Sequence, residues 1–242
     1  FTSGTPSVPR GFHLDIDPPA RPSRFLADSD AGIRLSTFKA GWDLTFNYLY
    51  HYDDVPAFPR SFRFTMDGPT VVVSPEYERS HLIGGTASKA FGDVTLRVEY
   101  GLFLDKYYPT RSLFDRDGVV KGDDFSYMVG LDWFGIKNTV VSVQMFQDWF
   151  TNTGKGVERD EVQTYTTFVV QHRLLNDTLT LEAVWFQDIN HGDGLIRPKA
   201  TYALNDRLSL YVGVDYFFGS DKGFFGQFDS KDRIYGGLTW SF

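Results

Sequence analysis

Apolar and polar residues alternate along most of this chain with a period of two. The clearest stretch is 208–218, where one side holds Leu208, Leu210, Val212, Val214, Tyr216 and Phe218 and the other holds Ser209, Tyr211, Gly213, Asp215 and Phe217. The last ten residues repeat the pattern, with Ile234, Gly236, Leu238, Trp240 and Phe242 on one side. A period of two predicts a β-strand with one apolar face and one largely polar face.

Eleven stretches of this kind follow one another. They cover roughly residues 31–38, 42–50, 77–88, 94–104, 125–133, 141–148, 162–174, 179–185, 196–204, 208–218 and 233–242. Most are about 9–13 residues long, which is the length that a tilted strand needs to cross a bilayer. Short turns and long loops alternate between them, as they do in outer-membrane barrels. The predicted fold is therefore all-β: an antiparallel, up-and-down transmembrane β-barrel over residues 31–242.

Residues 1–30 are predicted to be a proline-rich loop or N-terminal segment, because proline cannot donate to a strand ladder. The order of short turns and long loops places the start of the strand at 31–38 on the long-loop side. Closed bacterial barrels have an even number of strands. We therefore expect either the C-terminal part of a longer barrel or a twelve-stranded barrel whose first strand is 11–17.

Composition agrees with a barrel. Aromatic residues make up 17% of the 242 residues, as expected for aromatic girdles at both membrane boundaries, and the mean hydropathy is only −0.26. No apolar run is long enough for a transmembrane helix. The absence of Cys excludes thiolate metal sites, and a net charge of −7 argues against nucleic acid as a partner. No signal peptide is visible after Phe1, so export requires a leader that was removed or lies outside this sequence.

The chain's last strand resembles the C-terminal signal of Gram-negative outer-membrane proteins. The residues that carry this resemblance are Leu238, Trp240 and Phe242, a terminal aromatic residue with apolar residues at alternate positions before it. The resemblance implies recognition by the barrel-insertion machinery and a location in the bacterial outer membrane, in contact with membrane lipid and lipopolysaccharide.

Several short motifs together resemble one proteobacterial outer-membrane family, catalogued as domain of unknown function 1302. The matching segments span residues 31–35, 41–44, 97–100, 196–202 and 223–228, and the last continues into Asp232, Arg233 and the final strand. The resemblance implies an outer-membrane location and the passage of hydrophobic compounds. It implies no catalytic residue.

Charged residues on the predicted polar faces are the candidate functional set. They are Arg34, Arg97, Glu99, Glu182, Arg197, Lys199, Asp215 and Arg233. Charges inside a barrel define the selectivity of a pore. The alternative is structural, because interior acids and bases also pair with one another, as the neighbours Arg97 and Glu99 are placed to do.

The sequence predicts a porin-like channel for the passive passage of small molecules, hydrophobic ones included, and not an enzyme. The five histidines are scattered over different strands and loops, and no catalytic, metal or cofactor motif is present. Two alternatives stay open: an outer-membrane barrel enzyme of the lipase or protease type, which needs His and Ser or Asp to converge at one rim, and a closed structural or surface-binding barrel. The oligomeric state stays open as well.

Overall fold

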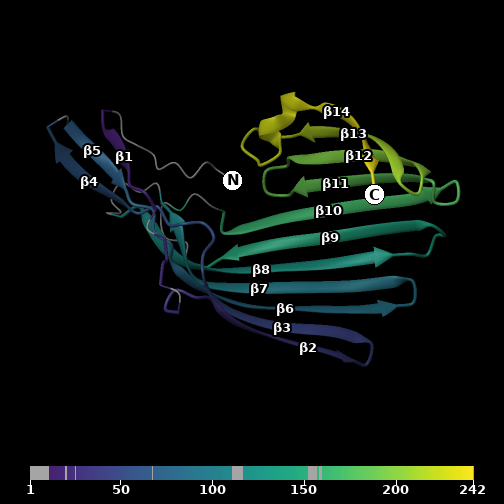
Figure 1. The fold of residues 1–242 in the computed structure, drawn as a ribbon, viewed down its shortest axis with the longest axis horizontal. Helices are drawn as coiled ribbons and strands as arrows, with labels where there is room; N and C mark the ends of the chain where they lie inside the picture. Colours follow the sequence, from purple (N-terminus) through teal and green to yellow (C-terminus); the bar gives the residue numbers. More distant parts are fainter. Residues whose placement is uncertain are drawn as a thin grey trace.

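One broad antiparallel sheet of eleven strands dominates the structure (Figure 1). The structure, a computed structural model, describes residues 11–19, 21–24, 26–66, 68–110, 117–151, 157 and 160–241. The strand order is β14-β13-β12-β11-β10-β9-β8-β7-β6-β3-β2, so neighbours in the sheet are also neighbours along the chain except where β6 follows β3. The predicted up-and-down antiparallel arrangement is confirmed.

The strands follow the predicted stretches closely. They are β2 (Ala31–Lys39), β3 (Trp42–Tyr52), β6 (Arg79–Phe91), β7 (Val94–Pro109), β8 (Val119–Trp133), β9 (Thr139–Phe150), β10 (Val162–Leu174), β11 (Leu179–Asp188), β12 (Gly194–Asn205), β13 (Leu208–Phe218) and β14 (Arg233–Trp240). A short 3₁₀ helix, η1 (Gly226–Lys231), lies between β13 and β14. Strands β7 and β8 extend further than predicted, into the segment 106–124 that the sequence assigned to a loop.

The strand register sorts the side chains into two faces that run across all eleven strands. Gln144 lies opposite Gly130 and Thr167, and Val143 lies opposite Leu131 and Phe168. The face that contains Gln144 is mostly polar, and we call it the polar face. The face that contains Val143 carries the alternate, mostly apolar residues of every strand, and we call it the apolar face.

The apolar face is the more exposed of the two. Val143, Phe168, Trp185 and Val212 all lie on it, and each is between 41% and 53% exposed. On the polar face, by contrast, Asp215 is buried. Large apolar side chains exposed over a whole sheet are unfavourable in water and favourable against lipid, so this face has the properties of a lipid-facing surface.

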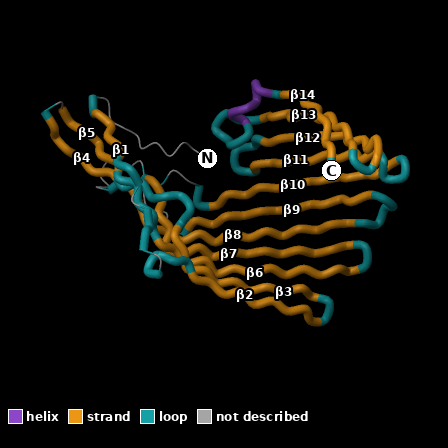
Figure 2. The backbone as a smooth tube through the Cα atoms, in the orientation of Figure 1, coloured by secondary structure: helices purple, strands orange, loops and turns teal. Residues whose placement is uncertain are grey.

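The short turns lie at one end of the sheet and the long connections at the other, which we call the long-loop rim (Figure 2). Beyond this rim lies a separate three-stranded sheet of β1 (His13–Ile16), β5 (Gly68–Val73) and β4 (Arg60–Thr65). Strand β5 forms its centre, pairing with β1 in parallel and with β4 in antiparallel.

This small sheet corrects two predictions. Residues 51–75 were expected to form one long loop, but β4 and β5 lie within them, because the run Val71–Val73 is buried and holds both neighbours. The twelve-stranded alternative was wrong in its choice of first strand, since β1 pairs with β5 and not with β2.

Closure into a barrel is not seen among the described residues. Strands β2 and β14 are the two edges of the main sheet, and each pairs with one neighbour only. The observed architecture is therefore an open up-and-down sheet with one polar and one apolar face. No helix in the described part of the chain is long and apolar enough to cross a membrane.

Candidate functional site

All eight charged residues predicted from the sequence lie on the polar face. The register places Arg34 opposite Asn47, Arg97 opposite Gly130 and Glu99 opposite Met128. It also places Glu182 opposite Lys199 and Asp215 opposite Arg233. Arg197 lies on the same side of β12 as Leu195 and Lys199, because these are every second residue of the strand. One face thus collects charged residues from six strands. Their role as the lining of a pore stays a prediction.

Three of these residues form one ion-paired group on β12, β13 and β14. The buried carboxylate of Asp215 accepts hydrogen bonds from Arg197 Nε at 2.7 Å and from Arg233 Nε at 2.6 Å. Both guanidinium groups lie near the ring of Tyr235, at 5.7 and 5.9 Å from its centre. Two partly exposed cations therefore share one buried anion, and this sector keeps an excess of positive charge.

The other predicted residues are arranged differently. The sequence indicated a pair between Arg97 and Glu99, but Arg97 pairs with Asp132 instead: its Nη2 donates to Asp132 Oδ1 at 2.9 Å. Glu182 accepts a long hydrogen bond of 3.4 Å from Gln171, and the Lys199 ammonium lies 5.2 Å from the centre of the Tyr211 ring.

The proposed insertion signal is only partly visible. Leu238 and Trp240 lie exposed on the apolar face of β14. Phe242 lies outside the described residues. Recognition of these three residues by the insertion machinery stays a prediction.

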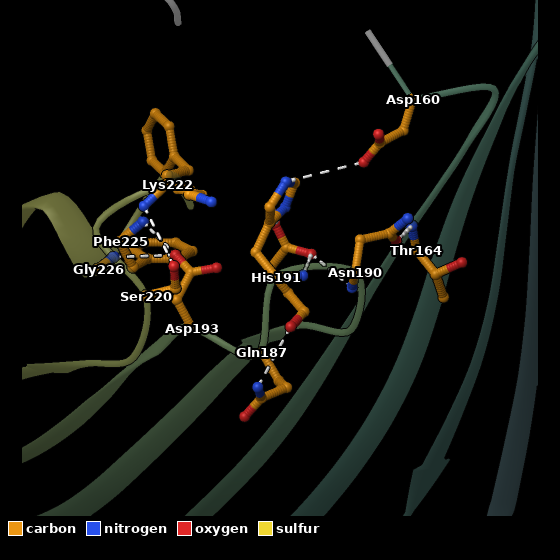
Figure 3. Close-up of polar contacts among 12 residues, drawn as sticks. Asp160, Thr164, Gln187, Asn190, His191, Asp193, Ser220, Lys222, Phe225 and Gly226 are labelled. Atoms are coloured by element: carbon orange, nitrogen blue, oxygen red, sulfur yellow. Dashed lines mark hydrogen bonds and ion pairs between the residues drawn. The ribbon is translucent and has the colours of Figure 1, made fainter.

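A second group of candidate functional side chains lies at the long-loop rim, in the connection between β11 and β12 (Figure 3). Asp188, the last residue of β11, is buried, and its Oδ1 accepts hydrogen bonds from the backbone N–H groups of Asn190 and His191. Its Oδ2 lies 2.9 Å from Nδ1 of His191. The imidazole is thereby held in place, and its Nε2 points toward Asp160 at 3.8 Å.

Asp193 joins this connection to η1. Its Oδ2 accepts hydrogen bonds from the backbone N–H groups of Phe225 at 2.6 Å and Gly226 at 2.9 Å. Gly223 also lies against this carboxylate, because a Cβ there would come within 1.9 Å of Asp193 Oδ1. The β11–β12 connection and η1 are therefore held together around one buried acid.

The electrostatics of the rim favour a charged His191. The hydrogen bond with Asp188 raises the pKa of His191 above its ordinary value of 6.5, and the negative charges of Asp188, Asp160 and Asp193 raise this pKa further. Burial opposes the shift. The net shift favours the protonated, charged form of the imidazole.

His51 and Ser80 form another contact at the same rim, as opposite residues of β3 and β6. Ser80 Oγ lies 3.3 Å from His51 Nε2 and donates to Asp53 Oδ1 at 2.8 Å. His51 Nδ1 lies 2.8 Å from the carbonyl oxygen of Tyr52. Ser80 is fully buried, so its hydroxyl is out of reach of a substrate in this arrangement.

Sequence reasoning missed the contacts at the rim, and two of them join residues that are far apart in the chain. His51 and Ser80 are 29 residues apart, and Asp193 lies 32 and 33 residues from its partners Phe225 and Gly226. Only the register between β3 and β6 would have revealed the first contact, and no local pattern marks the second.

Comparisons with known proteins agree with the fold. No family model and no curated protein matches the sequence, so the resemblance to domain of unknown function 1302 stays a prediction. Solved structures similar to this chain include a loop L8 deletion mutant of OmpT, an outer membrane protein of Vibrio cholerae (TM-score 0.52, 12% identity over 86% of this chain), and OmpT of the same organism folded in vitro (TM-score 0.50, 11% identity over 87%). This chain spans 62% and 64% of their lengths.

At this identity the similarity shows the fold alone, which is that of outer-membrane proteins. The predicted location is confirmed: a sheet with this fold and an exposed apolar face belongs in the bacterial outer membrane.

The prediction that the chain is not an enzyme was wrong as an exclusion. It rested on histidines that the sequence left scattered, whereas the structure places His191 on Asp188 and His51 on Ser80 at one rim. The similarity to the OmpT structures shows the fold alone, so it gives no ground for excluding an enzyme.

The raised pKa of His191 makes a testable prediction about pH. A group whose pKa is raised by folding stabilises the folded state below its unfolded pKa, and this contribution disappears as the pH rises through the folded pKa. We expect the ¹H NMR titration midpoint of His191 to lie above 6.5 in the folded protein. The substitution D188N should lower the midpoint more than D160N, because the hydrogen bond with Asp188 is the largest cause of the shift. Equal midpoints in all three proteins would contradict this account.

Proposed function

We propose that the chain forms the wall of an outer-membrane β-barrel through which small solutes, hydrophobic ones included, pass by diffusion. The observation that carries this proposal is the continuous polar face, with charged residues contributed by strands from β2 to β14. Charged side chains on such a wall have a function in an aqueous lumen, where they attract, orient or exclude solutes. The apolar face then contacts membrane lipid and lipopolysaccharide.

The charges of the polar face are unevenly distributed. On β11 to β14, the bases Arg197, Lys199 and Arg233 outnumber the acids Asp215 and Glu182. On β7 to β9, the acids Glu99, Asp132 and Asp148 accompany Arg97. A lumen with a basic sector and an acidic sector acts on both the charge and the dipole of a passing solute.

Closure of the barrel is part of this proposal. A strand edge within lipid leaves backbone N–H and C=O groups without partners, and this is strongly unfavourable. The free edges of β2 and β14 therefore require further hydrogen-bonded partners in the membrane. We place the long-loop rim outside the cell and the short turns in the periplasm, as in other barrels.

Single-channel conductance in a planar bilayer tests the conduit. We expect steady conductance that rises with salt concentration, together with a preference for anions that weakens in the double variant R197Q/R233Q, because this variant removes two positive charges from the basic sector. The matched control is K89Q: Lys89 lies on the apolar face, beside the rings of Trp42 and Phe91 near a short turn, so its loss should leave ion selectivity unchanged.

A silent bilayer, with folding confirmed by circular dichroism, would contradict the conduit. So would an equal change of selectivity in R197Q/R233Q and K89Q, because the polar face would then have no special access to the solute.

A second candidate function is hydrolysis at the long-loop rim, and His191 is the observation that favours it. Its Nδ1 is held by the buried Asp188, which leaves Nε2 to take a proton from water. The His191 side chain is 30% exposed, so a substrate can reach it. His51, by contrast, contacts the hydroxyl of Ser80, which is fully buried. A barrel enzyme of the lipase or protease type would use this acid–base group.

A screen with chromogenic esters and fluorogenic peptides tests this second candidate. We expect H191A to abolish detectable hydrolysis, because a positioned acid–base group contributes about 10²–10⁴-fold. D188N should weaken hydrolysis, because Asp188 holds the imidazole. H51A should retain activity, because Ser80 is shielded from substrate. Hydrolysis that survives H191A would contradict this role, and the absence of hydrolysis in the folded wild type would exclude it for the substrates tested.

A further inference from the structure

Three side chains at the long-loop rim offer ligand atoms to one point. Asp188, His191 and Asp193 each place one potential metal-binding atom within 4.8 Å of the others. Asp188 and Asp193 are essentially inaccessible to solvent, with exposed fractions of 1% and 0%. Two buried carboxylates at this separation repel one another unless a positive charge lies beside them, and either a protonated His191 or a bound cation supplies that charge.

The Asp193 carboxylate supplies a second, independent observation. Its Oδ2 is satisfied by two backbone N–H groups, but its Oδ1 is buried and has no hydrogen-bond partner among the residues that the structure describes. Figure 3 shows this carboxylate with one oxygen turned toward the side of His191. An unsatisfied buried carboxylate oxygen is costly, and a bound cation would remove that cost.

The geometry points to a binding site for one divalent transition-metal ion, of the Zn²⁺ class, formed by Asp188, His191 and Asp193. An imidazole nitrogen with two carboxylate oxygens is a ligand set that suits such an ion better than Ca²⁺ or Mg²⁺, which prefer oxygen ligands alone. Three protein ligands leave at least one coordination position for water. The site goes beyond the proposed passage of solutes and does not depend on it.

The position of the site gives the ion a structural consequence. Asp193 is hydrogen-bonded to the start of η1, and Asp188 ends β11. A metal ion held by both residues would connect the β11–β12 connection to the segment that leads into β14. Metal binding should therefore protect the rim from proteolysis.

Equilibrium dialysis of the full chain in detergent against Zn²⁺, with metal content measured by mass spectrometry, tests the site. We expect about one Zn²⁺ per chain, and Co²⁺ in its place should give the d–d absorption bands of a low-coordinate site. D193N keeps an oxygen for the N–H groups of Phe225 and Gly226 but replaces the free carboxylate oxygen, so it should preserve folding and weaken binding by at least about tenfold. H191Q should weaken binding to a similar degree.

The matched control is D160N, since Asp160 faces His191 but is not one of the three ligands. It should retain the metal. Binding that survives both D193N and H191Q, or a folded wild type that takes up no Zn²⁺, would overturn the site. Uptake of Ca²⁺ in preference to Zn²⁺ would overturn the role of His191. None of these readouts involves conductance or hydrolysis, so failure of the site and failure of either proposed function are distinguishable.

Discussion

The structure depends on one constraint: backbone N–H and C=O groups in lipid must find partners within the protein. Eleven strands meet this constraint everywhere except at the outer edges of β2 and β14, because each strand pairs with the next. Once the backbone is paired, the two-residue period of a strand assigns every second side chain to lipid and the others to the opposite face. The polar face, its charges and the rim sites are consequences of that arrangement.

The same constraint explains how much the sequence could predict. The positions of the strands and their two faces follow from alternation, and the structure confirms them because lipid on one side makes the alternation strict. All eight charged residues on the polar face were found in this way. Strands β4 and β5 were missed because they are short, lie outside the main sheet and follow Pro56 and Pro59, which indicated a loop.

Contacts between strands were beyond the sequence for a different reason. Alternation tells which face a residue occupies but not which residue lies beside it, because that depends on register and on the length of each loop. The pairing of Arg97 with Asp132, rather than with Glu99, is one example. The hydrogen bonds of Asp193 with the backbone of Phe225 and Gly226 are another, since they join the β11–β12 connection to η1, two segments that the sequence assigned to separate loops.

The rim and the wall have different chemistry for the same structural reason. Residues on the polar face are held by their strands, and all of them project to the same side of the sheet. Charged side chains such as Arg197 and Arg233 remain partly exposed there. At the rim the chain leaves the sheet, and buried acids are needed to satisfy backbone N–H groups that no strand partner reaches. These acids create the surroundings in which His191 changes its charge.

The central claim is that one face of the sheet contacts lipid and the other contacts water, and cysteine accessibility tests it most directly. The chain contains no Cys, so V143C and Q144C each introduce a single reactive thiol on neighbouring residues of β9. In lipid vesicles, a water-soluble maleimide should label Q144C and leave V143C unmodified until detergent is added. Equal labelling of the two variants, or labelling of V143C alone, would contradict the account.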